Sequence, residues 1–440
     1  MIFVKTPVIL FLLFMGFSAV VSGQTKEWEI LNNEVKLLFQ KGQYDKATIV
    51  AKNALAMAEK GFGADHPAVA VSLNNLAELY RAQGQYALAE PLLKRSLSLM
   101  EKILGRDQPN VAKGVDNLAA LYHAQGQYVL AESLFKRSLV SREKALGPDH
   151  PDVATSLNNL AALYQAQGQY AQAEPLYKRS LEIWEKALGL DHPNVATSLN
   201  NLAELYRAQG QYAQAEPLLR RALKISEKAL GSDHPNVATN LNNLAELYRA
   251  QGQYALTEPL YKRSLEIWEK ALGLDHPNVA TSLNNLAELY RAQGQDAQAE
   301  PLLKRALKIS EKALGPDHSN VAQSLNNLAL LYSSQGQYAQ AEPLFKRALE
   351  IWEKALGPDH PDVAKNLHNI AVLFDAQGQY EQAESLYKRS LEIWEKTLGP
   401  DHPDMVLGLN NLAEFYRATN RISKAEELEK RAANIQTTRH

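Results

Sequence analysis

The chain has 440 residues, of which 45% are hydrophobic, and its 47 Lys and Arg nearly balance its 49 Asp and Glu. A formal net charge of -2 leaves no basic excess to hold a phosphate backbone, so we expect no nucleic-acid partner. There is no cysteine, which excludes disulfides and thiolate chemistry. A chain of this length would ordinarily form two or three globular domains, but internal repetition replaces that expectation.

Residues 1–23 have the pattern of a secretory signal peptide. Lys5 precedes an apolar run over residues 8–21, and the small residues Ser22 and Gly23 follow it. The run is shorter than the roughly 20 residues that a membrane-spanning helix needs. We therefore expect cleavage after Gly23, export to the periplasm or the medium, and no stable membrane insertion afterwards. The alternative is an uncleaved anchor.

Two markers recur at one fixed step along the rest of the chain. The first is Asp-His-Pro, at residues 65–67, 149–151, 191–193, 233–235, 275–277, 359–361 and 401–403, with imperfect copies at 107–109 and 317–319. The second is a glycine, at positions 42, 84, 126, 168, 210, 252, 294, 336 and 378, with Asn420 in the tenth place. A fixed period of about 42 residues predicts a solenoid. We divide residues 24–440 into ten units that start near residues 24, 66, 108, 150, 192, 234, 276, 318, 360 and 402.

Each unit is predicted to be a helical hairpin. In the fifth unit, apolar residues spaced by three and four form one stripe on each of two helices, at Val195, Leu199, Leu202, Ala203 and Tyr206 and at Ala215, Leu219, Ala222 and Leu223. Asp191 or His192 is the expected cap of the first helix, before Pro193 in its first turn. Gly231 is expected to end the second helix in a left-handed cap. One hairpin cannot bury both stripes, so stacking is required.

The repeated residues carry a family resemblance. The run Asn-Leu-Ala-x-Leu-Tyr, then Gln-Gly-x-Tyr-x-x-Ala-Glu and Lys-Arg-Ser/Ala-Leu, resembles the tetratricopeptide repeat. The usual unit of that family has about 34 residues, and the longer variety, of about 42 residues, is similar to the repeats of kinesin light chains and their bacterial relatives. The resemblance implies an all-α, right-handed superhelical solenoid of about ten hairpins that binds extended peptides in its concave groove without a cofactor. Only residues 24–31 lie between the expected signal segment and the first repeated residues, which leaves no room there for the heptad coiled coil of kinesin light chains, so a motor-adaptor role is not expected.

Two rows of side chains are the candidate groove residues. The first is an asparagine pair on each first helix, and the second is a row of arginines further along the same helices. In the middle units these are Asn158, Asn159, Asn200, Asn201, Asn242, Asn243, Asn284, Asn285, Arg207, Arg249 and Arg291. An amide donates and accepts, so it can hold a peptide backbone, and a guanidinium can fork onto a carboxylate.

Each row also has a structural interpretation. The second Asn occurs in all ten units, which suits a register-holding role and a binding role about equally. The first Asn changes to Asp116 and His368 in two units, which favours ligand contact. The arginines lie three positions after glutamates such as Glu204, so they also suit exposed intrahelical ion pairs.

No catalytic or metal site is predicted, because acids, serines and histidines recur as ladders and do not form one unique cluster. The segment 174–211 is repeated without change at 258–295, which extends a surface. We therefore expect a non-catalytic scaffold that binds a protein or an extended, acidic peptide. The alternatives are a structural spacer and a non-catalytic subunit of an envelope or secreted complex. We expect an elongated arc in which units contact only their neighbours, with a weak unit where Gly114 interrupts a helix.

Overall fold

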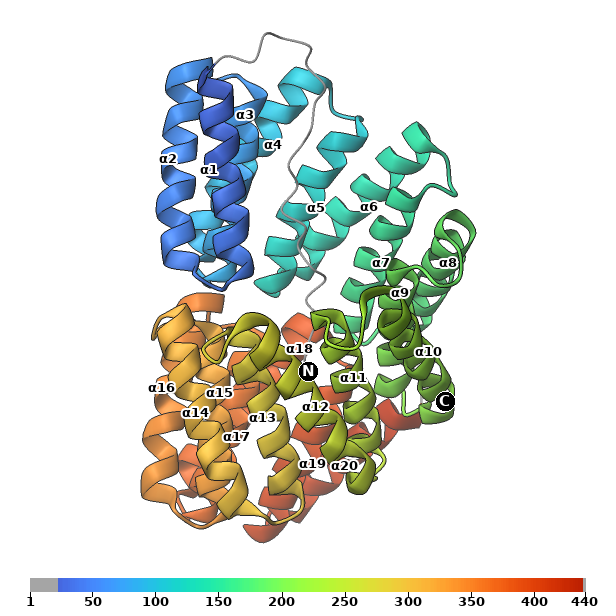
Figure 1. The fold of residues 1–440 in the computed structure, drawn as a ribbon. Coiled ribbons are helices and arrows are strands. Elements are labelled where there is room, and N and C mark those ends of the chain that lie inside the picture. Colours follow the sequence, from blue (N-terminus) through green and yellow to red (C-terminus); the bar gives the residue numbers. More distant parts are fainter. Residues whose placement is uncertain (1–22, 438–440) are drawn as a thin grey trace.

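A computed structural model describes residues 23–437, and these form twenty helices with no strand among them. The helices pair into ten hairpins in chain order (Figure 1). Their bounds are α1 Gly23–Gln40, α2 Tyr44–Phe62, α3 Pro67–Ala82, α4 Tyr86–Leu104, α5 Pro109–Ala124, α6 Tyr128–Leu146, α7 Pro151–Ala166, α8 Tyr170–Leu188, α9 Pro193–Ala208, α10 Tyr212–Leu230, α11 Pro235–Ala250, α12 Tyr254–Leu272, α13 Pro277–Ala292, α14 Asp296–Leu314, α15 Ser319–Ser334, α16 Tyr338–Leu356, α17 Pro361–Ala376, α18 Tyr380–Leu398, α19 Pro403–Ala418 and α20 Ile422–Thr437.

The Asp-His-Pro marker starts the first helix of a unit. His192 is the N-cap of α9, and its Nδ1 accepts a hydrogen bond from the Asn194 backbone N–H at 3.1 Å. Asp191 instead pairs with Lys228 of α10 at 2.5 Å, which ties the loop to the second helix of the same unit. Of the two expected caps, histidine is therefore the one used. Pro193 at the first helical position has no N–H that would be left unpaired.

Glycine ends both helices through a positive φ. Gly210 turns the chain between α9 and α10 with a φ of 74°, a conformation that glycine reaches without strain. Gly231 caps α10 with a φ of 87° and a ψ of 156°. The predicted left-handed cap at Gly231 is therefore wrong, because φ is positive as expected but ψ is extended. The extended ψ sends the chain directly into the loop that carries the next Asp-His-Pro.

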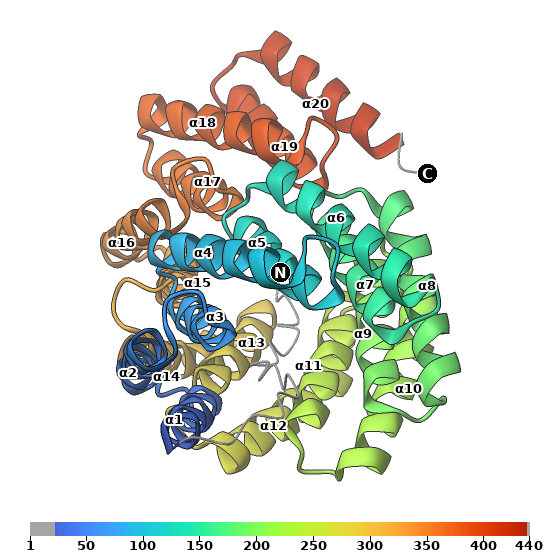
Figure 2. The same cartoon turned by 90° about the horizontal axis from the view of Figure 1, so that it is seen from above.

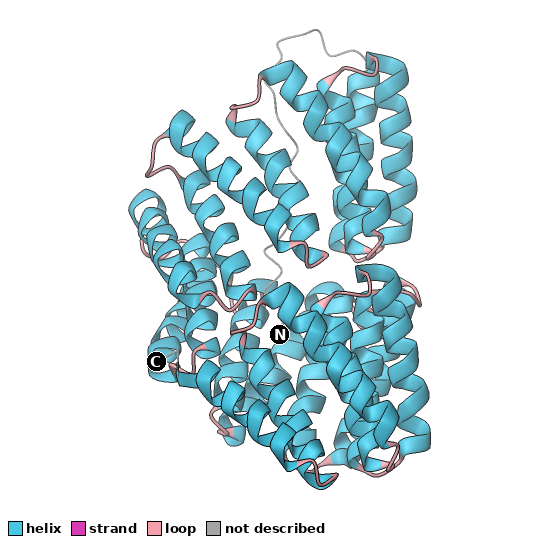
Figure 3. Ribbon diagram, turned by 180° about the vertical axis from the view of Figure 1, so that it is seen from behind, coloured by secondary structure: helices cyan, strands magenta, loops and turns pink. Residues whose placement is uncertain are grey.

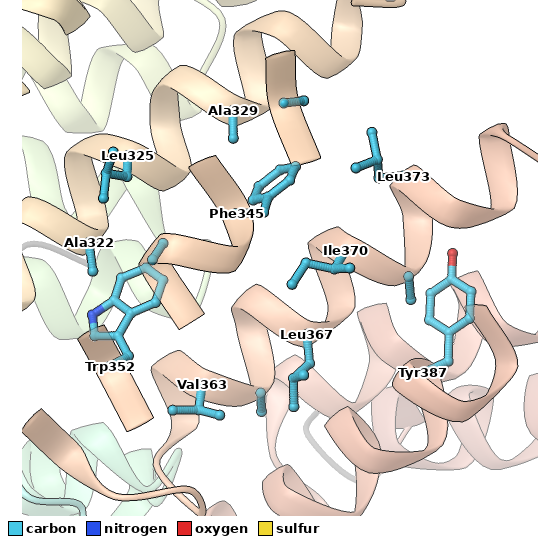
Figure 4. Close-up of a cluster of buried hydrophobic side chains, with 14 of the residues drawn as sticks. Ala322, Leu325, Ala329, Phe345, Trp352, Val363, Leu367, Ile370, Leu373 and Tyr387 are labelled. Carbon is cyan, nitrogen blue, oxygen red and sulfur yellow. The ribbon is translucent and has the colours of Figure 1, made fainter. Parts of the chain in front are cut away.

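The core is shared between neighbouring units, as the hairpin stripes require. Around α15 to α18, aromatic side chains of the second helices fill the spaces between small and branched residues of the first helices (Figure 4). Phe345 and Trp352 of α16 are 0% and 3% exposed, between Leu325 on α15 and Leu367 on α17. A buried Leu or Phe contributes about 1.5 to 3 kcal/mol, so each interface between units is a substantial part of the stability.

The array curves with the first helices on its inner side. Successive first helices such as α9 and α11 contact one another directly. Viewed from above, α9 and α11 lie inside α10 and α12 (Figure 2). Helices that approach closely on one face and diverge on the other produce a concave and a convex surface. The curvature is strong enough to bring distant units together.

The superhelix closes on itself after between five and six units. A Cβ at Gly42, in the first unit, would lie 3.1 Å from His276 Cδ2 and 3.1 Å from Pro277 Cδ, where the seventh unit begins. Gly84, Gly126 and Gly168 meet His318, His360 and His402, one unit further along the chain each time. The first units therefore sit on the seventh and later units (Figures 1 and 3). The expected arc with contacts only between neighbours is wrong, because the rotation at each interface accumulates to more than one full turn.

The expected signal segment, residues 1–23, lies outside the described residues except for Gly23, where α1 begins. Among the helices that the structure describes, none is long and apolar enough to cross a membrane. The described part of the chain therefore contains no candidate membrane span, and processing of the segment stays a prediction.

Two glycines within first helices should respond oppositely to alanine. α5 runs unbroken through Gly114, and a Cβ there would lie 3.5 Å from Leu97 Cδ1, an ordinary contact. A Cβ at Gly408 would lie 2.7 Å from Leu391 Cδ2 and 2.9 Å from Trp394. We expect Gly114→Ala to stabilise the array by up to about 1 kcal/mol and Gly408→Ala to destabilise it by about 1 to 3 kcal/mol. Thermal unfolding of both variants measures this, and equal shifts would contradict the packing described here.

Candidate functional site: the concave surface

The first asparagine of each middle pair is buried. Asn158, Asn200, Asn242 and Asn284 are 3% to 9% exposed. Asn158 Oδ1 accepts a hydrogen bond from Asn201 Nδ2 at 2.8 Å. Asn200 and Asn284 donate to the following first helix, at 2.5 Å to Asn240 Oδ1 and 3.1 Å to Ser324 Oγ. These amides link neighbouring units, so their contact with a ligand stays a prediction that the geometry does not favour.

The second asparagine of the pair is buried to a different degree from unit to unit. Asn159 and Asn201 are half-buried, whereas Asn243 and Asn285 are 9% and 7% exposed. Asn285 Nδ2 donates to Asn242 Oδ1 at 2.7 Å, the same bond between units that Asn201 makes. Asn243 Nδ2, in contrast, has no hydrogen-bond partner among the described residues. At Asn201 and Asn285 the row therefore joins neighbouring units, which suits the register-holding interpretation, whereas the buried Asn243 Nδ2 makes no such bond.

The arginines form ion pairs within their own helices. Arg207 binds Glu204 through two hydrogen bonds, at 2.8 Å from Nε and 2.5 Å from a terminal nitrogen. Arg249 makes its closer contact with Glu246 at 2.8 Å. Burial by itself would lower the pKa of Arg207, but the Glu204 carboxylate raises it, so the side chain stays charged. The arginines therefore make the intrahelical ion pairs that the structural interpretation of this row describes.

Arg291 is held least tightly of the three. Its one ion pair, to Glu288, is 3.3 Å long, and its buried Nε has no hydrogen-bond partner among the described residues. The side chain is 32% exposed, against 21% for Arg207. A guanidinium has five N–H donors in a fixed fork, so Arg291 keeps most of its hydrogen-bonding capacity for another group.

A buried ion pair replaces the amide ladder in the third unit, and the sequence interpretation missed it. Asp116 stands where the next unit has Asn158, and Arg142 stands where it has Trp184. The two side chains form an ion pair at 2.6 Å, in which Arg142 is 3% exposed and Asp116 is 9% exposed. Burial raises the pKa of Asp116, and the Arg142 guanidinium opposes that shift. Both positions depart from the repeat in the same unit, and this coincidence in the sequence could have revealed the ion pair.

On the convex face, ion pairs join neighbouring units. Arg179, Arg221 and Arg263 bind a glutamate of the preceding second helix at 2.8, 2.7 and 2.7 Å. Lys178 pairs with Glu174 within its own helix at 2.7 Å. The Lys-Arg pairs of this face are therefore neutralised by glutamates. The three arginines are unsuitable as a neutral comparison for groove variants, because each one joins two units.

No group of three or more His, Asp or Glu side chains is placed to hold a metal ion within residues 23–437. The repeated histidines are instead used as helix caps, as at His192 and His234. The concave surface therefore offers amide and guanidinium donors and carboxylate acceptors. That chemistry suits recognition of polar chains.

The hairpins and their spacing agree with a known repeat family. The model of a family described as tetratricopeptide repeat matches residues 29–102, 110–186, 152–228, 195–256, 236–312, 297–354, 320–396 and 376–438. The chain belongs to the tetratricopeptide repeat family. A comparison with curated proteins gives no significant match.

Solved tetratricopeptide structures are similar to parts or most of the chain. A putative kinesin light chain with nearly identical repeats from Podosopora anserina is 33% identical over 47% of this chain and 97% of its own, with a TM-score of 0.40. BtubC from P. vanneervenii is 25% identical over 53% of this chain and 92% of its own, with a TM-score of 0.43. A Rap protein complexed with Competence and Sporulation Factor is 16% identical over 84% of this chain and 99% of its own, with a TM-score of 0.57.

The buried ion pair of the third unit can be tested by restoring the repeat. Arg142→Trp alone leaves Asp116 buried without a cation, which should cost about 3 to 5 kcal/mol of stability. The double variant Asp116→Asn with Arg142→Trp recreates the pairing of residue types in the next unit and should recover most of that loss. Chemical unfolding of the three proteins measures the coupling. A double variant as unstable as the single one would show that the pair does not account for the loss.

Proposed function

We propose that this protein is a non-catalytic scaffold that binds an extended protein segment along its concave surface, centred on α9, α11 and α13. Tetratricopeptide solenoids are commonly protein-binding folds. The observation that carries the proposal is the repetition of one set of inner side chains in three consecutive units. The sequence Asn-Leu-Ala-Glu-Leu-Tyr-Arg occurs at 201–207, 243–249 and 285–291, and a fourth copy stands apart from these at 75–81.

Repetition suits a chain-like partner, because an extended backbone presents its own amides at a regular spacing. Asn201 is half-buried and contributes an amide to this repeated set. The Rap protein whose fold is similar was solved in complex with Competence and Sporulation Factor, so one protein of similar fold holds a partner. These features support a polypeptide partner for this chain.

The arginine row favours acidic residues in that partner. Arg207 and Arg249 each face the glutamate of the next unit as well as their own. Arg291 has the weakest pairing and the greatest unused donor capacity. A carboxylate of the partner that displaces the long contact to Glu288 would gain a charge-assisted, forked interaction. We place the acidic end of the bound segment there.

The arginine row can be tested with a fluorescent polyglutamate peptide on the chain that begins at Gln24. Replacing Arg207, Arg249 and Arg291 together by Ala should weaken binding by well over tenfold, because hydrogen bonds to charged groups contribute about 1.5 to 3 kcal/mol each. Among the single variants, Arg291→Ala should weaken it most. Fluorescence anisotropy measures the affinity, and circular dichroism checks that helicity is kept.

The matched comparison is a triple alanine variant at exposed lysines of second helices, Lys224, Lys308 and Lys430. It removes the same charge without touching the concave surface or an ion pair between units. Equal weakening by both triple variants would show that only net charge matters, and the concave model would be wrong. No binding of any acidic or neutral peptide by the native array would favour the spacer.

We further propose that the protein acts after export, as the pattern of residues 1–23 suggests. Mass spectrometry of the protein from its native cells should find a mature N-terminus at Gln24 in an exported fraction. The physical reason is the short apolar run followed by small residues, which suits cleavage more than anchoring. An intact Met1 in the membrane fraction would contradict this and support an anchored scaffold.

A further inference from the structure

The contact between successive superhelical turns repeats one chemical pairing four times. Hairpin turns at Gly42, Gly84, Gly126 and Gly168 meet the capping histidines His276, His318, His360 and His402. We call this contact the seam and these four residues the seam histidines. His276, His318 and His402 are 4% to 8% exposed. The glycines at 210, 252, 294, 336 and 378 have no heavy atom within 4 Å of the equivalent point, so the seam is confined to the first four turns.

At His318 and His360 both ring nitrogens make hydrogen bonds, and these bonds fix which nitrogen carries the proton. Nδ1 of His318 accepts the Asn320 backbone N–H at 2.9 Å, so that nitrogen carries no proton. In the neutral ring Nε2 then carries it and donates to the Ala82 carbonyl of the other turn at 2.9 Å. His360 makes the equivalent bond to Ala124. One neutral tautomer therefore serves the cap and the seam together.

Four other capping histidines provide an internal comparison. His66, His150, His192 and His234 accept from the backbone two positions ahead in the same way, but lie exposed or half-buried outside the seam. We call these the rim histidines. Protonation removes the cap acceptor in both groups and places a cation at the positive end of a helix. Only at the seam must that cation also be buried between two turns.

The groups around the seam do not cancel this cost. Asp362 lies 3.7 Å from His360 Nδ1 and favours its charged form, but its own side chain is 49% exposed. On the opposing turns lie Arg81, the buried Tyr128 and His123, whose pKa burial lowers to about 4. Asp404 stands near His402 at 3.9 Å in the same way as Asp362. Burial is the largest influence on His360 and lowers its pKa, with Asp362 and the Ala124 carbonyl opposing.

The imperfect marker at residues 317–319 belongs to the same contact. Ser319 occupies the place of the usual proline, and its side chain hydrogen-bonds the Tyr86 hydroxyl across the seam. Tyr86 is largely buried there, which raises its pKa. The departure from the repeat thus adds a neutral hydrogen bond at the turn where Gly84 meets His318 less closely, at 3.5 Å.

We propose that the seam is a pH-sensitive latch, in which protonation of the seam histidines separates the two superhelical turns and opens the concave surface along its side. A histidine whose pKa is lower in the closed form than in the open form stabilises the closed form at pH values above its ordinary pKa, about 6.5. That stabilisation is lost as the pH falls through the lowered value. Acidification therefore opens the seam. The consequence for access of a bound segment rests on the proposed function, whereas the opening itself does not.

Small-angle scattering of the chain from Gln24 onward, between pH 8 and pH 5, tests the latch. The maximum dimension should increase with a midpoint below about pH 6.5, while circular dichroism shows retained helicity. Replacing all four seam histidines by Gln, the residue that the third unit already has at position 108, should give the open dimension at pH 8 and abolish the pH dependence. The same change at the four rim histidines should leave the native transition in place.

A milder double variant tests the latch while leaving every helix cap intact, so that the protein stays folded. Tyr86→Phe with Ser319→Pro removes the seam hydrogen bond without altering a cap, and should shift the opening midpoint to higher pH. A dimension that stays constant from pH 8 to pH 5, or an equal effect of seam and rim variants, would overturn the latch. If the seam opens as described but the polyglutamate peptide binds at no pH, the latch stands and the proposed function fails.

Discussion

The curvature of this array depends on the small residues that let successive first helices touch. Ala196 and Ala203 on α9 are 2% and 0% exposed, and the equivalent alanines recur in the neighbouring units. The second helices carry the larger side chains, such as Trp352 and Phe345, and so stand further apart. Interiors are close-packed, so this difference in volume fixes a rotation at every interface. The concave surface, the ion pairs of the convex face and the seam all follow from that rotation.

The charged side chains of the outer face are paired with opposite charges as regularly as the core side chains are packed. The second to ninth units pair the aspartate of the loop ahead of them with a lysine of their second helix, as Asp191 pairs with Lys228. The second to tenth units pair an arginine with a glutamate of the preceding unit. Surface pairs of this kind contribute at most about 1 kcal/mol each, so they set alignment more than they set stability. Against this background the loosely paired Arg291 stands out as a group that the fold leaves available.

The sequence predicted the hairpins well because each depends on contacts within one period. Pro193, Gly210 and the apolar stripes between them specify α9 and α10 locally. The seam could not be predicted in the same way, because it joins residues as distant as Gly42 and His276 through an angle that no single residue encodes. The roles of the asparagines were left open for a related reason. An amide such as Asn158 has the same identity whether it bonds a ligand or Asn201, and only burial separates the two cases.

The seam also bears on how an array of this kind changes its length. Residues 174–211 and 258–295 are identical, so whole units of this sequence are interchangeable building blocks. Each seam turn meets the cap of the sixth unit ahead, and from the fourth unit onward every first helix has the same histidine cap. Insertion or deletion of one whole unit in the middle would therefore exchange one turn-and-cap partner for an equivalent one. The number of units can vary while the contact between turns is preserved, provided that more than six remain.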